Sequence, residues 1–349
     1  MKIKKHFIKN ILILLITAIG ISGCTLSPKN SQNHKTSSSY ITKSSFLLNT
    51  IITITIYDKQ DENILNNAID LIGDYEKIFS RTDRESELSK VNQEISNSNN
   101  IKEIEISDEL TEILRYGLYY SQLSEGAFDI TIGPLTSIWD FTSSEPSLPS
   151  NNDIQDALHY VNYDSLQLEN NKIISYKPGA SIDLGAIAKG YIADKVKEYL
   201  VSTGVESAII NLGGNILCIG NKPDGSPFKI GIQKPFADRD ETIAAMEITD
   251  LSVVSSGIYE RFFIKDDKTY HHILNPTSGY PYESDLISVS IISEQSVDGD
   301  GLSTTCFALG LEKGMELVEN MPNTYGIFIT KDYKIHYTDG FSDSIKVIE

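Results

Sequence analysis

Two carboxylates and three hydroxyls gather in the stretch 298–305, which reads Asp-Gly-Asp-Gly-Leu-Ser-Thr-Thr. The residues from Leu302 onward look helical, so Asp300 and Thr304, four residues apart, should share one face of a helix start. Carboxylate and hydroxyl oxygens suit Mg²⁺ as ligands. A Ca²⁺ loop and simple capping of the helix by Asp300 are the rival interpretations, although the spacing does not match an EF-hand loop.

Two of the six histidines of the chain are adjacent, His271 and His272, and a loop sequence, Asn-Pro-Thr-Ser-Gly, follows at 275–279. Neighbouring residues of an extended chain point to opposite sides, so one imidazole can face a cleft while the other faces the core or solvent. A histidine placed in this way can act as a base near neutral pH. A purely structural histidine is the alternative.

The segment 181–191 suggests a phosphate site and reads Ser-Ile-Asp-Leu-Gly-Ala-Ile-Ala-Lys-Gly-Tyr. Asp183 and a glycine open a predicted helix whose free backbone N–H groups suit a phosphate, and Lys189 in the first turn adds a positive charge. The competing interpretation is that Asp183 only caps the helix and that Lys189 is solvated.

Two further segments combine small residues with candidate ligand contacts. At 211–215 the sequence Asn-Leu-Gly-Gly-Asn places paired glycines between two strands, which permits either close approach to a ligand or a plain hairpin turn. At 125–135, Phe128 and Asp129 stand beside small residues and could line a pocket for a flat ring. The alternative for this second segment is a helix end that enters a loop.

The helices and strands that would position these groups follow from hydrophobic periodicity. Apolar residues at helical spacing predict helices over 62–79, 108–124, 302–309 and 312–320. Alternating or short apolar runs predict strands over 50–57, 206–212, 216–219, 228–233, 245–248 and 286–292, and a closing hairpin over 325–330 and 334–337. Because helices and strands do not alternate strictly, we predict an α+β fold of mixed sheets and helices rather than a doubly wound parallel sheet.

The first 45 residues are predicted to target and tether the protein. Four lysines flank the start of an apolar run over 11–19, and Ile-Ser-Gly-Cys follows at 21–24, which resembles the lipobox of bacterial lipoproteins. We predict a signal peptide over 1–23, lipidation of Cys24, a flexible linker over 24–45 and a folded domain over 46–349. The protein would then be extracytoplasmic and anchored by lipid to the bacterial cell membrane; an ordinary signal peptide with a chance cysteine is the alternative.

Charge and cysteine content exclude several classes of protein. Removal of residues 1–23 takes away four of the 30 basic residues and none of the 48 acidic ones, which leaves a net charge of −22. This charge argues against nucleic acid as a partner, and it means that a phosphate ligand needs a metal or local donors. Besides Cys24, only Cys218 and Cys306 remain, both in apolar stretches, so we predict buried free thiols and neither a zinc nor an iron–sulfur site.

Five blocks, in this order, resemble the signature blocks of the FAD:protein FMN transferases, the ApbE family. They are Asp-Leu-Gly-Ala-Ile-Ala-Lys-Gly at 183–190, Asn-Leu-Gly-Gly-Asn at 211–215, Ser-Gly-Ile-Tyr-Glu-Arg at 256–261, His-His-Ile-Leu-Asn-Pro-Thr-Ser-Gly at 271–279 and Asp-Gly-Leu-Ser-Thr at 300–304. The resemblance extends over residues 46 to about 340 and includes Gly-Ala-Phe-Asp at 126–129. It implies a single α+β catalytic unit with FAD in a central cleft, Mg²⁺ at the pyrophosphate, and transfer of FMN to a Thr or Ser of an acceptor protein.

The resemblance also implies roles for individual residues. Asp300 and Thr304 would bind Mg²⁺ through side-chain oxygens, and Ala186 through its backbone carbonyl. Contacts with FAD are implied for Leu48, Thr82, Ala127, Phe128, Asp129, Asp183, Lys189 and Ile273. The chain departs from the family pattern at 48–50, where Leu-Asn-Thr replaces the common Met-Gly-Thr, and at Thr82, where an aromatic residue is common.

The implied chemistry is attack by an acceptor hydroxyl on the phosphorus of the FMN half of FAD, with AMP as the leaving group. We predict that His272 is the base for this hydroxyl and that His271 is the second choice. The same site could instead hydrolyse FAD to FMN and AMP, or the protein could be a flavin-binding lipoprotein without turnover. The family's usual acceptors are membrane-associated or secreted redox proteins, so we expect extracytoplasmic FMN-acceptor proteins as partners.

Overall fold

The structure is a computed structural model that describes residues 40–97, 103–141, 145–238 and 240–348. The predicted signal peptide over 1–23 and the predicted lipidation site Cys24 lie outside the described residues. All the described elements belong to one compact unit, as predicted for a single catalytic unit. Within these ranges, no helix is both long enough and apolar enough to cross a membrane.

The first strand corrects the predicted boundary between linker and domain. β1 (Ile41–Leu47) starts inside the predicted linker 24–45 and pairs antiparallel with β2 (Thr50–Ile56). The outer face of this hairpin is polar except near its turn, where Phe46 and Ile51 are exposed. Its hydroxyls meet across the strands: Thr42 Oγ1 lies 3.0 Å from Thr55 Oγ1. A composition rich in Ser and Thr suits a strand with one solvated face as well as a linker, which is why composition alone misplaced the boundary.

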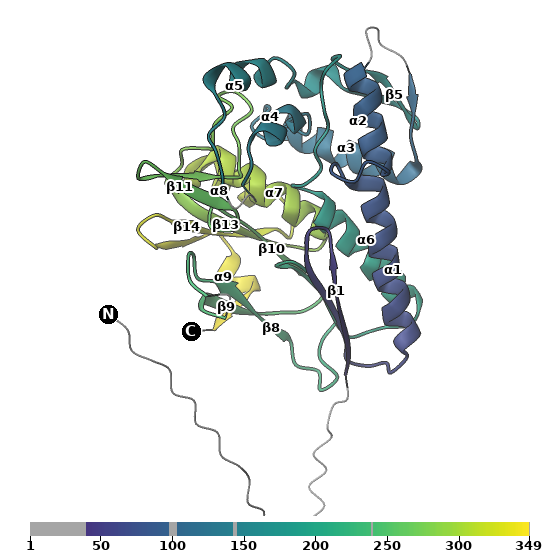
Figure 1. The fold of residues 1–349 in the computed structure, drawn as a ribbon. Coiled ribbons are helices and arrows are strands. Elements are labelled where there is room, and N and C mark those ends of the chain that lie inside the picture. The colour runs from purple at the N-terminus through teal and green to yellow at the C-terminus, as the bar shows by residue number, and fades with distance from the viewer. Residues whose placement is uncertain (1–39, 98–102, 142–144, 239, 349) are drawn as a thin grey trace, which may run out of the picture. The chain divides into compact units, whose positions relative to one another are not determined.

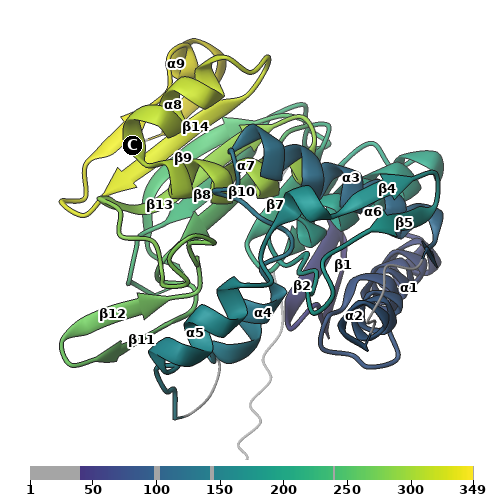
Figure 2. The ribbon, with the colours of Figure 1, turned by 90° about the horizontal axis from the view of Figure 1, so that it is seen from above.

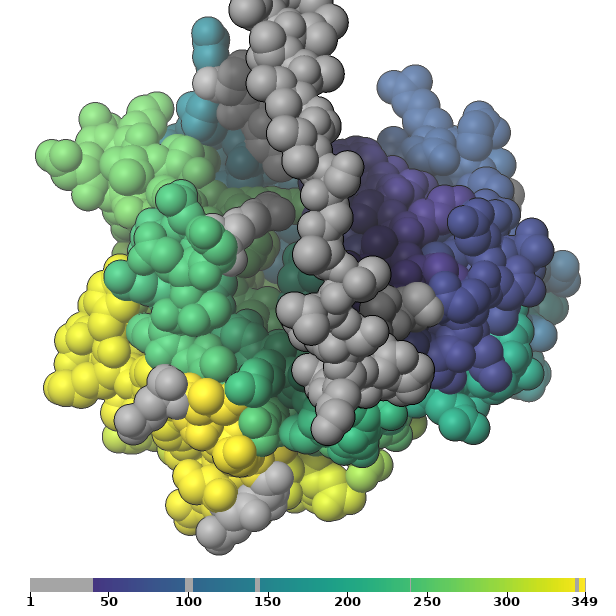
Figure 3. Space-filling view, turned by 90° about the horizontal axis from the view of Figure 1, so that it is seen from below, coloured from purple at the N-terminus to yellow at the C-terminus, as the bar shows by residue number. Residues whose placement is uncertain are grey.

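A sheet of eight strands forms the centre of the fold, in the order β1-β2-β6-β7-β10-β13-β14-β15, and every neighbouring pair is antiparallel. The strands after β2 are β6 (Ala208–Leu212), β7 (Asn215–Ile219), β10 (Ser252–Gly257), β13 (Leu286–Ser293), β14 (Tyr325–Thr330) and β15 (Ile335–Tyr337). Every residue of β13 is buried. In Figure 3 the purple N-terminal residues and the yellow C-terminal residues lie on opposite sides with green between them, as this order requires.

Each face of the large sheet is covered by a different layer (Figures 1 and 2). Helices pack on one face: α1 (Glu62–Phe79), α3 (Asp108–Leu123), α6 (Ala188–Ser202), α7 (Ser296–Leu309) and α8 (Leu311–Glu319). A three-stranded sheet packs on the other face, in the order β16 (Lys346–Ile348), β9 (Thr242–Ile248) and β8 (Phe228–Gln233), beside α9 (Phe341–Ser344). The mixed α+β architecture is therefore confirmed.

Smaller elements flank this core. A cluster of apolar residues around Trp139 joins α4 (Gly133–Ile138) and α5 (Asn151–Leu158) to the hairpin of β11 (Phe262–Lys265) and β12 (Lys268–His271). The remaining elements are α2 (Glu87–Asn97), β3 (Ile104–Glu105), β4 (Gln167–Glu169), β5 (Lys172–Ser175) and a 3₁₀ turn at Tyr163–Ser165. The hairpin carries the two candidate histidines: His271 is the last residue of β12, and His272 follows it directly.

The start of α7 differs from the sequence prediction, which placed the helix over 302–309. The helix begins six residues earlier, at Ser296, and includes the acidic Asp-Gly-Asp-Gly segment. The two glycines serve close packing: a Cβ added at Gly299 would lie 2.8 Å from Val254 Cγ2, and one added at Gly301 would lie 2.4 Å from Tyr120 Cε2. Glycines that look like a loop in sequence thus let a buried helix approach β10 and α3.

Candidate active site

Asp300 is the buried carboxylate at the centre of the candidate site, with a relative exposure of 3%. Its Oδ2 accepts a hydrogen bond of 2.9 Å from the backbone N–H of Gly190, and its Oδ1 lies 3.3 Å from Lys189 Nζ. Both partners belong to the first turn of α6, whose N-cap residue Ile187 has no side chain that accepts hydrogen bonds. The segments 183–190 and 300–304 therefore meet where α6 begins.

Hydroxyl groups lie one helical turn away from this carboxylate. Thr304 Oγ1 is 3.0 Å from Ser256 Oγ, at the end of β10, and Ser256 Oγ is 2.8 Å from Ser303 Oγ. Sequence reasoning did not single out Ser256, although it lies in the block at 256–261. This carboxylate and these hydroxyls are hard oxygen donors of the kind that Mg²⁺ accepts. Ala186, whose carbonyl the family resemblance adds to the set, lies just before the start of α6.

The donor set fits a cation that is shared with a phosphate ligand. In the described ranges, no group of three or more His, Cys, Asp and Glu side chains is placed to hold a metal ion. Mg²⁺ is commonly held by only one or two carboxylates together with substrate phosphates, so a single buried carboxylate is sufficient when a dinucleotide supplies the other oxygens.

Asp298 does not join Asp300, contrary to the predicted two-carboxylate cluster. Its Oδ1 accepts a hydrogen bond of 2.6 Å from the hydroxyl of Tyr120, on α3. Two residues span about 200° around a helix, so the two carboxylates point to opposite sides of α7. The early start of α7 is the cause, because in a loop both side chains could have turned to one cation.

His272 is half-buried, and its geometry defines its tautomer. Nδ1 lies 3.3 Å from the backbone carbonyl oxygen of Arg261, which can only accept, so Nδ1 carries the proton and Nε2 keeps a free lone pair. Burial and the positive charge of Arg261 lower the pKa of His272 from 6.5 to about 4, and Lys189 contributes to the shift. His272 is therefore neutral at pH 7 and able to accept a proton.

His271 is a core residue, as one member of the pair was expected to be. It is 6% exposed, its Nε2 lies 3.0 Å from the carbonyl oxygen of Tyr282, and its ring packs edge-on against Phe307. Its buried Nδ1 has no hydrogen-bond partner in the part of the chain that is described. This placement makes His272 the better candidate base.

Asp183 is held in place by groups that sequence reasoning missed. Its Oδ2 lies 3.0 Å from Arg81 Nε and accepts a hydrogen bond of 2.7 Å from Thr136 Oγ1, while its Oδ1 accepts one of 2.9 Å from the N–H of Gly185. Asp183 is not the cap of α6, because that helix begins at Ala188. The one sequence signal for Arg81 is its place next to Thr82, a position implied to contact FAD.

Backbone contacts bring three of the sequence blocks to one place. The N–H of Asp183 donates to the carbonyl of Ile130 over 2.8 Å, which joins the block at 126–129 to the block at 183–190. The hydroxyl of Tyr282 donates to the carbonyl of Ala127 over 2.9 Å, and its N–H donates to the carbonyl of Ile273 over 3.0 Å. Tyr282 thereby links the loop 126–129 to the histidine segment.

Several predicted FAD contacts have side chains that are directed into the protein. Phe128 and Ile273 are each 5% exposed, and Phe128 packs edge-on against Tyr120. Asp129 accepts hydrogen bonds from the N–H and hydroxyl of Thr131 at 2.7 and 2.6 Å. These side chains shape the loop, so a ligand would meet mainly backbone atoms there.

The two positions at which the chain departs from the family pattern lie in a turn and after a helix. Leu48 and Asn49 form the β1–β2 turn, with φ of +54° and +56°, and the N–H of Leu48 donates to Glu76 over 2.8 Å. Asn tolerates this left-handed conformation, which explains how it replaces a glycine. Thr82 is exposed just beyond α1.

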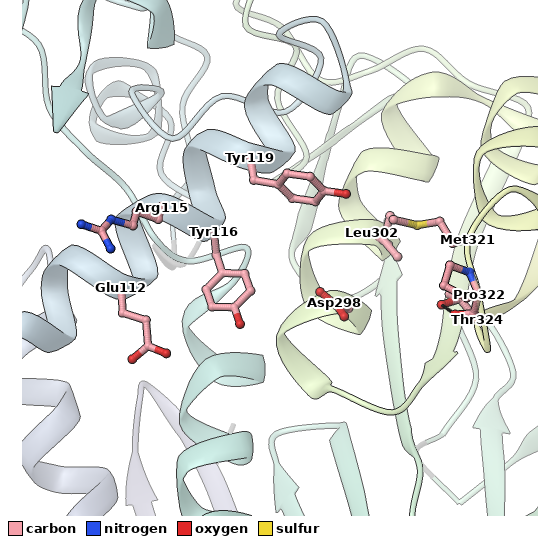
Figure 4. A pocket seen from close by; sticks show the side chains of 9 residues that line it. All are labelled: Glu112, Arg115, Tyr116, Tyr119, Asp298, Leu302, Met321, Pro322 and Thr324. Carbon is pink, nitrogen blue, oxygen red and sulfur yellow. Dashed lines mark hydrogen bonds between the residues drawn. The ribbon is translucent and has the colours of Figure 1, made fainter. Parts of the chain in front are cut away.

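Two cavities border α7. One, of about 580 Å³, is bounded by Tyr116 and Tyr119 from α3 and by Asp298 from α7 (Figure 4). The other, of about 500 Å³, borders α6 and includes Asp194 in its lining. Neither includes Asp300, Thr304 or His272.

The chain is similar to proteins of one known family over most of its length. The model of the ApbE family matches residues 48–329. The FAD:protein FMN transferase of Klebsiella pneumoniae (strain 342) is 36% identical over 294 residues, which cover 84% of this chain and 90% of that protein. The protein of the same name from Treponema pallidum (strain Nichols) is 27% identical over 350 residues, with 95% and 96% covered.

Solved structures share the fold. The flavin transferase ApbE from Vibrio cholerae superposes with a TM-score of 0.78 at 26% identity, over 88% of this chain and 99% of the other. The ApbE protein of Thermotoga maritima gives a TM-score of 0.79 at 29% identity, with the same coverage. The predicted family resemblance and fold are confirmed by these likenesses.

Proposed function

The chain belongs to the ApbE family, and we propose that it transfers the FMN part of FAD to a Thr or Ser hydroxyl of acceptor proteins and releases AMP. Flavin transfer to proteins is supported by the relatives that carry this name over most of the chain. The observation that carries the finer proposal is the meeting of Asp300 with Lys189 and Gly190 at the start of α6. The neutral His272 is the candidate base for this site.

Asp300, Thr304 and the carbonyl of Ala186 are proposed to hold Mg²⁺. When bound there, the cation would neutralise the pyrophosphate and orient its oxygens. The ammonium group of Lys189, in the first turn of α6, would bind the phosphate oxygens. Asp183, fixed by Arg81 and Thr136, would contact the same dinucleotide.

The proposed reaction is a phosphoryl transfer assisted by one base. The acceptor oxygen forms a bond to the phosphorus of the FMN half, and the bond from that phosphorus to the bridging oxygen breaks, so AMP leaves with that oxygen. Nε2 of His272 takes the proton of the acceptor hydroxyl. Because this nitrogen is unprotonated at pH 7, the proton can move without prior loss of another.

We further propose that the N-terminal segment directs the protein out of the cytoplasm and that a lipid on Cys24 anchors it to the membrane. Its acceptors would then be extracytoplasmic redox proteins. Radiolabelled palmitate supplied to the producing bacterium should label the wild-type chain and not the Cys24→Ala variant.

The reaction is tested with the full chain, FAD and Mg²⁺, with and without an acceptor domain. Flavin fluorescence on the acceptor after denaturing electrophoresis is the expected result. AMP formed without labelling would make the protein an FAD pyrophosphatase, and FAD binding with neither product would make it a flavin-binding protein.

Variants of two neighbouring carboxylates test the metal assignment. Asp300→Asn should lower transfer about 100-fold or more through loss of the cation. Asp298→Asn is the matched control, because it removes the same charge from the same helix on the opposite side, and it should retain activity within a few-fold. Equal activity of the two variants would refute the assignment.

His272→Gln tests the base. It should keep the affinity for FAD and lower the transfer rate by about 10²–10⁴-fold. If the affinity for FAD falls as much as the rate, His272 is a binding residue instead.

A further inference from the structure

Helices α6 and α7 cap each other. Asp300 of α7 satisfies the N–H of Gly190 in the first turn of α6. Asp194 of α6 satisfies the first turn of α7 in return: its Oδ1 accepts from the N–H of Ser296 over 2.7 Å, and its Oδ2 from the N–H of Val297 over 2.8 Å. Asp300 lies four residues after Ser296 on α7, and Asp194 lies four residues after Gly190 on α6. Each carboxylate is therefore on the face of its helix that meets the other helix.

Neither helix has a cap of its own. The N-cap residues Ile187 and Gln295 make no capping hydrogen bond through their side chains. The first N–H groups of a helix have no partner within it, so burial without an external acceptor would cost stability. The N–H of Ala188 bonds to the carbonyl of Leu184, and the N–H of Gly190 depends on Asp300. The N–H groups of Ser296 and Val297 depend on Asp194 in the same way.

The two helices are in close contact where the capping carboxylates lie, and this contact holds the carboxylates in place. A Cβ added at Gly190 would lie 2.3 Å from the carbonyl oxygen of Ser296, so backbone meets backbone there. The hydroxyl of Ser296 adds further links, donating to Asn215 Oδ1 over 2.8 Å and lying 2.8 Å from Ser252 Oγ. α7 is thereby tied to α6 and to the central sheet at its first residue.

We propose that Asp194 is a positioning residue of the transferase site, which sets the affinity for the divalent cation by fixing the helix that carries Asp300 and Thr304. This inference rests on the proposed function. The carboxylate of Asp194 bonds to the first turn of α7, one turn before Asp300, so it would act on the cation only through this helix. Partners that orient metal ligands change metal affinity about 10–100-fold when they are removed.

The environment of Asp194 supports a role beyond stability. Burial raises the pKa of Asp194 from 3.8 to about 6, against the effect of its two backbone hydrogen bonds. Carboxylates whose pKa is raised by burial in this way are common at functional sites. A carboxylate is also the group that the geometry requires, because the two N–H donors bond to different oxygens and an amide would offer only one.

The test compares Asp194→Asn with Glu198→Gln. Glu198 lies one turn further along α6, lines the same cavity and is exposed, and its carboxylate pairs only with Lys195 among the described residues. Mn²⁺, followed by electron paramagnetic resonance, is the probe of the cation site in the FAD-saturated full chain. FAD affinity is measured separately in the presence of EDTA, and folding by thermal unfolding.

Asp194→Asn should raise the Kd for Mn²⁺ about tenfold or more, while FAD affinity without metal changes less than twofold. Glu198→Gln should change neither. An unchanged Kd for Mn²⁺ in folded Asp194→Asn would overturn this inference and leave the proposed function intact. Failure of the wild-type chain to bind Mn²⁺ would overturn both.

Should Asp194→Asn fail to fold, Ser296→Pro removes one of the two donors and leaves the carboxylate in place. Proline is favoured at the first position of a helix, and Gln295 already has the extended backbone, φ −101° and ψ 133°, that precedes it. Ser296→Ala controls for the lost hydroxyl. A higher Kd for Mn²⁺ in the proline variant than in the alanine variant is expected, and equal values would overturn the inference.

Discussion

Gly190→Ala should separate the two helices that form the candidate site. The added Cβ would lie 2.3 Å from the carbonyl oxygen of Ser296 and 2.7 Å from Val297 Cα, whereas ordinary contacts begin at 3.4 Å. Both neighbours are backbone atoms and cannot rotate away. The helices must therefore move apart by about 1 Å at this point.

The size of the effect follows from two opposing contributions. Overpacking of a buried contact costs about 1–3 kcal/mol, and alanine in place of glycine in a helix returns about 1 kcal/mol. The free energy of unfolding should fall by up to about 2 kcal/mol. Transfer should fall much more, about 100-fold, because a shift of 1 Å separates Lys189 from Asp300 and misplaces the reacting groups.

The assay measures thermal unfolding and the rate of flavin transfer for Gly190→Ala beside Gly73→Ala. Gly73 lies inside α1, and a Cβ there meets nothing within 4 Å. This control should gain about 1 kcal/mol of stability and keep full activity. A Gly190→Ala protein with the transfer rate of the wild type would refute the argument that the close contact of α6 and α7 sets the site.

Two further predictions concern residues around the site. Burial lowers the pKa of His271 from 6.5 to about 4, so between these pH values the unfolded chain binds a proton that the folded chain does not. The stabilising contribution of the neutral imidazole is therefore fully present above pH 6.5 and is lost as the pH falls toward 4. The full loss is about 3 kcal/mol for this group, and His271→Gln should show a smaller difference between urea unfolding at pH 7.5 and 4.5. Arg81→Gln removes the partner of Asp183 and should weaken FAD binding about tenfold, as measured by quenching of flavin fluorescence. An unchanged FAD affinity would remove Asp183 and Arg81 from the binding site.

Local patterns in the sequence were sufficient for many elements. The spacing of apolar residues predicted α1 over 62–79, and the observed helix has the same bounds. The paired glycines at 213–214 form the turn between β6 and β7, with φ of +67° and +100°. Cys218 and Cys306 are buried free thiols, as their apolar neighbours predicted.

Contacts between distant segments were beyond these patterns. The pair of Arg81 and Asp183 joins residues about a hundred positions apart, as does the bond from Gly190 to Asp300. The sequence around each residue of such a pair does not indicate which residue is its partner. Only the sequence resemblance brought the blocks together in advance, and it said nothing of Arg81 or Asp194.

One misplaced boundary altered the predicted chemistry of the site. With α7 beginning at Ser296, Asp298 bonds to Tyr120 and only Asp300 faces α6. A single carboxylate, already paired with Lys189, is a weak site for a divalent cation by itself. In the proposed site the pyrophosphate would therefore supply much of the negative charge that holds the cation, and the cation would offset the repulsion between a dinucleotide and a chain of this acidity. Under this proposal FAD and the cation would each raise the affinity for the other by the same factor, so the cation would bind together with the flavin substrate and not in its absence.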